Sequence, residues 1–381
     1  MKQRIQQPIP ITRPYMPPKD EFMNYANSLW ETRHLTRNGP LVNELQEQLK
    51  ERLQVPNLIV FANGHLALDC ALKALNLQDG EAITTPFTYL STANALAMNS
   101  LTPVFCDIKE DDCTIDERKI ESLITSKTKV IVPVHVYGFP CNWACIQEIA
   151  DKYNLKVVYD AAHAFGVTVE GRGIGTFGDA SMFSFQATKV YHTVEGGAIS
   201  YQNKELTEKL IAAKNFGLVE AEEADSISLN AKMSELHAAM GLANLKTIND
   251  QIARRKELIE HYLESLSKVN GIRLFHWDTP GINYNYAYFP IIFEPDILGI
   301  SRDEIARRLE QEYRVLVRKY FYPLLSDLHC YPQQDSNTTP IAQKIASSVL
   351  TLPLFTEMTH EQVDFVCDSL KEILKRDGDR T

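Results

Sequence analysis

Several features that define large classes of protein are missing from this chain of 381 residues. No apolar run reaches the roughly 18 residues that a membrane-spanning helix needs. The segment Met1–Ile5 has no apolar core and no small-residue cleavage site, so we expect no secretory signal and a cytoplasmic protein. The net charge of −10 disfavours nucleic acid, whose binding requires basic surface. We therefore expect neither a membrane nor a nucleic acid as partner.

The motifs of several enzyme classes are missing too. There is no Gly-x-Gly-x-x-Gly fingerprint, no Walker loop and no His-Glu-x-x-His zinc helix. Cys141 and Cys145 are four residues apart, but no second pair completes a tetrahedral metal site. We expect seven free, reduced thiols and no bound metal.

Length and composition are those of a globular enzyme. Hydrophobic residues make up 44% of the chain and charged residues 23%, an ordinary balance for a folded domain. A chain of 381 residues exceeds one usual core, so we expect two domains, residues 1–250 and residues 251–381.

The first domain shows the pattern of an α/β fold with a mainly parallel, mixed sheet. Nearly continuous apolar runs predict strands buried on both faces at 58–61, 82–85, 103–107, 130–134 and 156–160. Helices are expected at 65–75 and 91–98, and the glycine-dense stretch 171–175 is expected to be a turn. The acidic stretch 220–228 predicts a mobile surface loop.

The C-terminal domain is expected to be smaller and of the α+β class. One long helix from Ser234 to Ile259 is predicted to bridge the two domains. A strand is expected from Tyr286 to Phe293 and a helix from Ser301 to Glu312, which opens on a capping pattern. A last helix is expected from His360 to Lys375.

The chemistry of the chain centres on Lys189. The apolar strand Val157–Tyr159 ends on Asp160, and Lys189 follows 29 residues later in the run Ser184-Phe185-Gln186-Ala187-Thr188-Lys189. Pyridoxal phosphate needs a carboxylate at its pyridine nitrogen, a lysine at its aldehyde and donors around its phosphate. Lys189 is therefore predicted to bond to this cofactor and to move the substrate proton, while Asp160 faces the ring nitrogen.

Each of these residues also has a simpler interpretation. Lys189 would fit a surface loop, and Asp160 would fit the N-cap of a helix. His163, three residues after Asp160, is predicted to face the ring hydroxyl of the cofactor, but a histidine buried in the core fits the sequence as well.

A phosphate-binding junction is predicted between the first strand and the helix after it. The backbone N–H groups of Gly64, His65 and Leu66 would point at the anion, and Ser184 would add a hydroxyl. Tyr89 is a candidate to stack on the pyridine face, although an isolated aromatic residue is more often part of the core.

Taken together, these residues resemble the DegT/StrS family of nucleotide-sugar aminotransferases over nearly the whole chain. The blocks that carry the resemblance stand in the order typical of the family: 35–40, 84–89, 134–138, 160–164, 178–179, 183–189, 195–198, 230–235, 318–324 and 352–355.

The resemblance implies the fold of aspartate aminotransferase and a homodimer whose active sites lie at the subunit interface. Asn230 of one subunit would reach the cofactor phosphate of the other. L-Glutamate would donate the amino group, and a nucleotide-linked keto sugar would accept it in a ping-pong reaction. Because Lys189 is present, the relatives that carry histidine there and dehydrate sugars are an unsuitable comparison.

The run Phe185-Gln186-Ala187-Thr188-Lys189 resembles family members that aminate C4, and the full-length pattern resembles those that make dTDP-4-amino-4,6-dideoxyglucose (viosamine) for surface polysaccharide such as O-antigen. Three positions depart from the family pattern. Gln186 stands where C4 enzymes more often have histidine, His65 where threonine or serine is common, and His163 where many members have glutamine.

The substrate contacts are the least defined part of the sequence. Asn38, Arg318 and Tyr320 are predicted to meet the substrate, with Tyr322 nearby, because arginine suits both a diphosphate and the glutamate carboxylates. An arginine that closes a domain interface fits equally well. A UDP- or GDP-linked 4-keto sugar, a cyclitol ketone, or a non-catalytic regulator on the same fold are the alternative functions.

Overall fold

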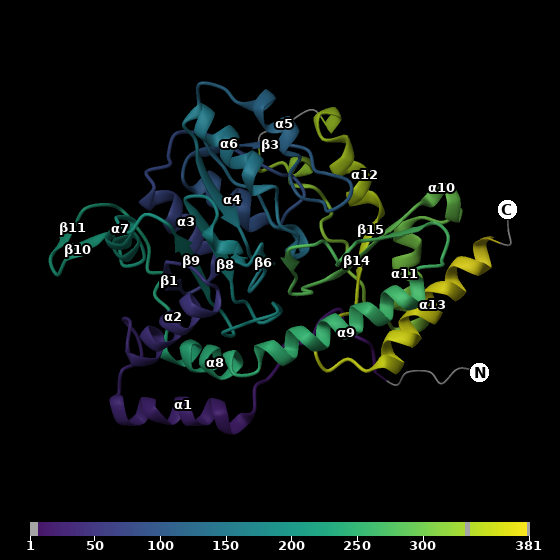
Figure 1. Ribbon diagram of the computed structural model, residues 1–381, viewed down its shortest axis with the longest axis horizontal. Helices are drawn as coiled ribbons and strands as arrows, with labels where there is room; N and C mark the ends of the chain where they lie inside the picture. The colour runs from purple at the N-terminus through teal and green to yellow at the C-terminus, as the bar shows by residue number, and fades with distance from the viewer. Residues whose placement is uncertain (1–6, 332–335, 379–381) are drawn as a thin grey trace.

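A seven-stranded mixed sheet organises the structure, a computed structural model that describes residues 7–331 and 336–378 (Figure 1). Its strand order is β1-β9-β8-β5-β4-β2-β3. Only β9 runs antiparallel to its neighbours β1 and β8; the other pairs are parallel. The strands are β1 (Asn57–Phe61), β2 (Gly80–Thr84), β3 (Leu101–Phe105), β4 (Thr128–Ile131), β5 (Lys156–Asp160), β8 (Ala180–Ser184) and β9 (Gly197–Tyr201). The predicted α/β class is confirmed, and so are the five predicted strands, with small shifts at their ends.

Side chains from both faces of this sheet are buried. In β5, Val157 and Tyr159 join the hydrophobic core on one face, while Val158 joins the core on the other. Successive strand residues point to opposite faces, so a strand covered on both sides must be apolar throughout. The covering helices are α2 (Pro40–Arg52), α6 (Trp143–Tyr153) and α8 (Glu235–Leu245) on one face, and α3 (Gly64–Ala74), α4 (Leu90–Met98) and α7 (Leu206–Ala213) on the other.

The helix predicted from Ser234 to Ile259 is in fact two helices, so that prediction was wrong. Ser234 caps α8 by accepting a hydrogen bond from the N–H of His237, and α9 begins at Ile248 and ends at Leu266. Thr247, at φ −117° and ψ 3°, lies outside helical geometry between them. The composition favours helix throughout, and one residue's backbone angles break it. The division at residue 250 stays a prediction, and that residue lies inside α9.

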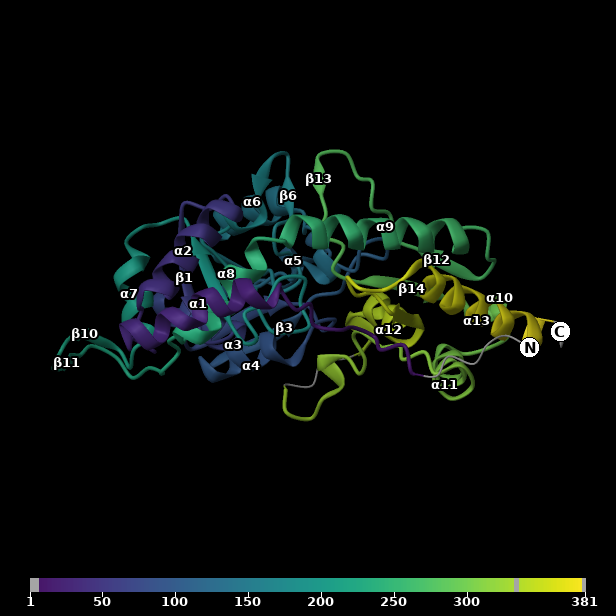
Figure 2. The same cartoon turned by 90° about the horizontal axis from the view of Figure 1, so that it is seen from below.

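Beyond α9, a three-stranded antiparallel sheet has the order β12-β14-β15. Helices surround it and share one large apolar core with it (Figure 2). The elements of this part are β12 (Ile272–Leu274), β14 (Phe289–Phe293), α10 (Pro295–Leu298), α11 (Arg302–Tyr313), α12 (Pro340–Ser348), β15 (Val349–Leu352) and α13 (His360–Gly378). The predicted strand 286–293 is shorter at its start, and the helices predicted at 301–312 and 360–375 are confirmed.

Asp107 fastens this C-terminal part to the large sheet. The residue follows β3, and its carboxylate accepts hydrogen bonds from the N–H groups of Ile341 (3.2 Å) and Ala342 (2.9 Å) at the start of α12. These are donors that a helix start otherwise leaves without partners. The side chain of Lys119 completes the contact at 2.7 Å from Asp107. The N-terminal segment also crosses between the parts, since Ile9 pairs with Val315.

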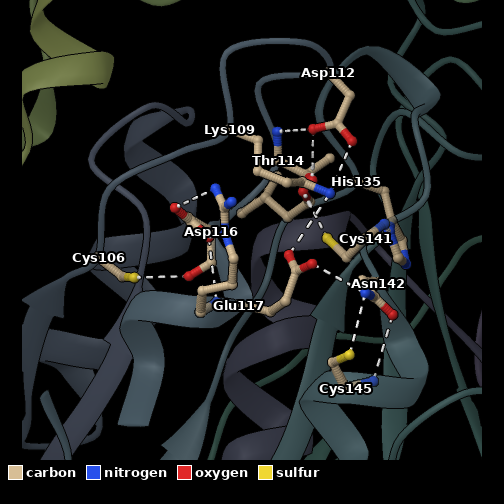
Figure 3. Close-up of polar contacts among 12 residues, drawn as sticks. Cys106, Lys109, Asp112, Thr114, Asp116, Glu117, His135, Cys141, Asn142 and Cys145 are labelled. Carbon is tan, nitrogen blue, oxygen red and sulfur yellow. Dashed lines mark hydrogen bonds and ion pairs between the residues drawn. The ribbon is translucent and has the colours of Figure 1, made fainter. Parts of the chain in front are cut away.

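A second polar network ties the loop after β3 to the start of α6 (Figure 3). Lys109 lies 2.9 Å from Asp112 and 3.6 Å from Glu117, and Glu117 accepts a hydrogen bond from the Asn142 side chain at 2.9 Å. Asn142 also caps α6 by accepting from the N–H of Cys145. Within residues 7–331 and 336–378, no group of three or more histidine, cysteine or acidic side chains is placed to hold a metal ion.

Two remaining segments differ in part from expectation. The acidic loop predicted at 220–228 contains a hairpin of β10 (Leu218–Glu220) and β11 (Glu223–Ala224). Instead of a simple turn, 171–175 contains β7 (Arg172–Gly173), which pairs with β6 (Thr168–Val169), and begins a short 3₁₀ helix. The other elements are α1 (Lys19–Thr32), α5 (Glu117–Ile120) and β13 (Ile282–Asn283). In the described part of the chain, no helix has the length and apolarity to cross a membrane.

Candidate active site

The candidate site lies where the parallel strands β5 and β8 end together. Asp160 is the last residue of β5 and pairs with Met182 of β8, which ends two residues later at Ser184. The backbone of Asp160 also bonds to the segment after β4, since its carbonyl accepts from the N–H of His135 at 3.0 Å. Ligands of open α/β sheets bind outside such carboxyl ends, so Asp160 and Ser184 lie at an edge of the sheet where a ligand is expected.

Asp160 carries a buried carboxylate that is held on both oxygens. Oδ2 accepts a hydrogen bond from the Thr92 hydroxyl at 2.7 Å, and Oδ1 accepts from the N–H of Ala162 at 3.0 Å. Burial raises the pKa of this carboxyl, while these two bonds and the charge of Lys189 act in the opposite direction. No helix begins here: Asp160 caps a turn, and its oxygens keep lone pairs for a further donor.

The His163 ring is buried with a defined tautomer. Its Nδ1 accepts a hydrogen bond from the backbone N–H of Tyr137 at 3.1 Å, so in the neutral ring the proton is assigned to Nε2. Burial, with a smaller effect from the Lys189 charge, lowers the pKa of His163 well below its ordinary value. The ring stacks on Phe321 with 5.9 Å between centroids. His163 therefore offers a fixed N–H donor rather than a charge.

Lys189 is half-buried on a turn that its own segment stabilises. Its N–H donates to the carbonyl of Gln186 at 2.9 Å, and the Gln186 side chain accepts from the N–H of Thr188 at 2.9 Å. Burial is the main cause that lowers the pKa of Lys189, against the opposing effects of Tyr320 and Asp160. A lowered pKa makes the neutral, nucleophilic amine more accessible. Gln186, which departs from the histidine more often found here in C4 enzymes, thus stabilises this turn through its side-chain hydrogen bond.

Sequence reasoning missed Tyr288, which is the direct partner of the Lys189 amine. The Lys189 Nζ donates a hydrogen bond to the Tyr288 hydroxyl at 3.4 Å, and the Tyr288 ring lies 4.6 Å from that of His163. Burial raises the pKa of Tyr288 to about 12. Tyr288 directly precedes β14, and no local signal connects it with a lysine 99 residues earlier.

The strand–helix junction predicted to bind phosphate is formed by β1 and α3, and one of its three expected donors is already occupied. A Cβ atom placed on Gly64 would lie 3.0 Å from the Cβ of Ser184, so the start of α3 lies against the end of β8. The N–H of Leu66, predicted to face the anion, instead donates to the Asn63 side chain at 2.9 Å. Asn63 is the N-cap of α3 and takes that donor for itself. The His65 ring contacts the Ser91 hydroxyl at 3.0 Å.

Two predicted cofactor contacts lie on open surface in a single chain. Tyr89, at the N-cap of α4, is 60% exposed, and its charge interaction with Lys189 places the two side chains near one another. Asn230 is exposed beside Ala231, whose carbonyl accepts from the N–H of Ala62 at 2.8 Å. That bond places Asn230 beside the strand end that leads into Gly64.

The predicted substrate residues fall into three places. Tyr320 is near the centre: its ring lies 5.7 Å from that of Tyr288, the partner of Lys189, and its hydroxyl accepts from Arg318 at 2.6 Å. Asn38 lies apart, with its side-chain oxygen bonded to the amine of Lys214 at 3.1 Å. Tyr322 packs instead between Arg302 and Lys319. The structure thus groups Arg318 and Tyr320 with Lys189 and does not bring Asn38 or Tyr322 to it.

This arrangement fits pyridoxal phosphate. A buried carboxylate with free lone pairs suits a protonated ring nitrogen, the N–H of His163 suits the ring oxygen, and an amine of lowered pKa suits the aldehyde. A groove of about 1010 Å³ along α9 and β12 is lined by none of the residues predicted for the site. The site is therefore placed by its chemistry and by the sheet topology, and not by this groove.

Comparisons with known proteins agree with this chemistry. The model of the DegT/DnrJ/EryC1/StrS aminotransferase family matches residues 18–371. The dTDP-4-amino-4,6-dideoxy-D-glucose transaminase of Shigella dysenteriae is 40% identical over 97% of this chain and 100% of its own, and that of Escherichia coli is 42% identical over 93% and 96%. Among solved structures, DesI with its TDP-sugar product is 31% identical, with a TM-score of 0.93 over 99% of this chain and 95% of that one.

The buried, neutral His163 predicts a pH dependence of stability. Because its pKa is lowered in the folded state, the unfolded chain takes up a proton first as pH falls below about 6.5. The free energy of unfolding should then decrease by up to about 1.4 kcal/mol per pH unit from this one group. His163→Gln removes that contribution, so urea denaturation between pH 6.5 and 5 should show a flatter dependence than wild type. Equal slopes would contradict the buried neutral ring.

Proposed function

Because the chain belongs to the DegT/DnrJ/EryC1/StrS aminotransferase family, we propose that it transfers the amino group of L-glutamate to C4 of dTDP-4-keto-6-deoxy-D-glucose. The products are dTDP-4-amino-4,6-dideoxy-D-glucose and 2-oxoglutarate. The observation that carries the proposal is that two relatives named for this amino sugar match the chain over nearly its full length. An amino sugar of this kind is a building block for surface polysaccharide such as O-antigen, and a cytoplasmic location suits a charged nucleotide substrate.

When bound, pyridoxal phosphate supplies an aldehyde that takes the amine and a ring that withdraws electrons from the carbon losing its proton. Asp160 would hold a proton on the ring nitrogen, and the Nε2–H of His163 would donate to the ring oxygen. Gly64, His65 and Ser184 would hold the phosphate. These residues would orient the ring, and hydrogen bonds to neighbouring groups hold the side chains of Asp160 and His163 in place for that role.

Lys189 would move the substrate proton. Its lowered pKa favours the neutral amine more than in a free lysine, and the Tyr288 hydroxyl holds that amine by a hydrogen bond. The exposed Arg318 donates a hydrogen bond to Tyr320 and has donors left for a carboxylate or a diphosphate. Glutamate and the keto sugar would therefore occupy this one place in turn, as a ping-pong reaction requires.

A homodimer with shared sites forms part of the proposal. Large apolar side chains are exposed on α1, on the segment after it and on α8, which packs against α1: Trp30 (77%), Leu35 (59%) and Leu236 (53%). Such a gathering is typical of a protein interface. The cavities beside Lys189 in one chain enclose only about 10 and 20 Å³. A second copy would cover the apolar residues, close the site and supply Asn230 of the partner subunit.

The acceptor is tested by incubating the purified enzyme with glutamate and dTDP-4-keto-6-deoxyglucose. We expect release of 2-oxoglutarate and a sugar product whose NMR spectrum shows an amine at C4. UDP- and GDP-linked 4-keto sugars and a cyclitol ketone are the comparison substrates, and each should react more slowly. Faster turnover of one of them, or an amine at C3, would replace the proposed acceptor while leaving the aminotransferase assignment intact.

The shared site is tested by mixing two variants that each lack part of it. Lys189→Ala should be inactive, and Asn230→Ala should be impaired because the partner's cofactor phosphate loses a contact. If the sites are shared, reassociated mixtures contain heterodimers with one complete site, and activity should recover to about a quarter of wild type. The same two variants mixed without dissociation and reassociation serve as the control, and their activity should stay at the sum of the separate variants. No recovery beyond the sum of the separate variants would show that each subunit works alone.

A further inference from the structure

Three cations gather near the end of β1 without a carboxylate partner. They are Arg37, in the segment before α2; Lys214, at the C-terminal end of α7; and Lys232, before α8. Within residues 7–331 and 336–378, none of the three forms an ion pair, although the chain has a net charge of −10. Other buried contacts do pair their charges, as Lys119 and Asp107 do at 2.7 Å. The missing counter-charge therefore calls for an explanation.

Lys214 shows the cost of this arrangement most clearly. The side chain is 2% exposed, and its amine bonds only to neutral oxygens: the side chain of Asn38 at 3.1 Å and the carbonyl of Val60 at 3.4 Å. Burial, assisted by the positive charge of Lys232, lowers the pKa of Lys214 to about 8. A buried cation without an anion destabilises the folded state, so its retention indicates a role in binding.

Lys232 extends the positive field toward the surface. Its amine donates to the Asn215 side chain at 2.6 Å and lies 4.8 Å from the centre of the Phe216 ring. Burial and the charge of Arg37 lower the pKa of Lys232, so Arg37 is an electrostatic neighbour of this lysine. Arg37 itself is exposed and directly precedes Asn38, the residue that Lys214 holds.

The three cations lie beside the proposed cofactor site. The N–H of Ala62 donates to the carbonyl of Ala231 at 2.8 Å, so the strand end that leads into Gly64 runs next to Lys232. Asn215 and Asn230 are bridged in the same place. The cofactor phosphate already has its own donors at Gly64, His65 and Ser184. An additional anion next to the site is therefore the ligand that these charges suit.

We propose that Arg37, Lys214 and Lys232 form a subsite for the diphosphate of the nucleotide-sugar substrate, with Lys214 acting through Asn38. The inference rests on the proposed function and extends it. A sugar diphosphate carries two negative charges and several acceptor oxygens, which arginine and lysine donors bind by charge-assisted hydrogen bonds. Recognition at this place explains how an acidic protein attracts an acidic substrate: the positive field is local.

Titration of the cofactor-loaded enzyme with dTDP by calorimetry tests the proposal. Lys232→Gln and Arg37→Gln should each weaken dTDP binding about tenfold, because each removes a charge-assisted contact. Lys209→Gln, an exposed lysine on the same helix as Lys214, removes an equal charge and should bind dTDP as wild type does. Melting temperatures within about 2 °C of wild type would show that the variants remain folded.

Three results would overturn the subsite. The first is dTDP affinity within twofold of wild type in both variants, and the second is no dTDP binding by wild type. The third is a loss of affinity for pyridoxal phosphate with dTDP binding retained, which would assign these cations to the cofactor. Failure of the proposed function looks different: the wild type would bind dTDP through these residues and yet leave the dTDP keto sugar unaminated.

Discussion

The Asp160 carboxylate and the Lys189 amine both lie at the end of the central sheet, where burial opposes the charge of each. Burial raises the pKa of the acid and lowers that of the lysine, and each charge partly offsets the cost of the other. Neighbouring residues hold both groups in position by hydrogen bonds. Thr92 and Ala162 hold the carboxylate, Gln186 holds the turn of the lysine, and Tyr288 holds its amine.

The same principle separates the two classes of cation in the molecule. Structural cations such as Lys119 have a carboxylate within hydrogen-bond distance. Lys189 and Lys214 are surrounded by neutral oxygens or aromatic rings, and burial lowers the pKa of both. Cations held in this way are poised for an anion or a carbonyl that arrives from solution. Because the protein is acidic overall, these positive sites are isolated on it, and an anionic ligand is attracted to them rather than to the rest of the surface.

The sequence predicted those elements that a short stretch of residues specifies by itself. The strand 156–160 has the predicted bounds because a continuous apolar run between turn residues specifies a buried strand. The prediction of one helix over 234–259 was wrong, because amino-acid composition does not determine the backbone angles of Thr247, where the helix breaks. The prediction that the N–H of Leu66 faces an anion was wrong, because this N–H donates to the side chain of Asn63. The roles of Tyr288 and Lys214 could not be predicted from the sequence. They depend on contacts with residues far along the chain, which only the fold brings beside them.

The central claim is that Lys189 carries the cofactor in the site built around Asp160. Treating the cofactor-loaded enzyme with borohydride attaches the cofactor permanently to the lysine that holds it, and peptide mass spectrometry then identifies that residue. The account predicts that the modified peptide contains Lys189 and that Asp160→Ala loads less cofactor. Modification of a different lysine, such as the buried Lys214, would contradict the account.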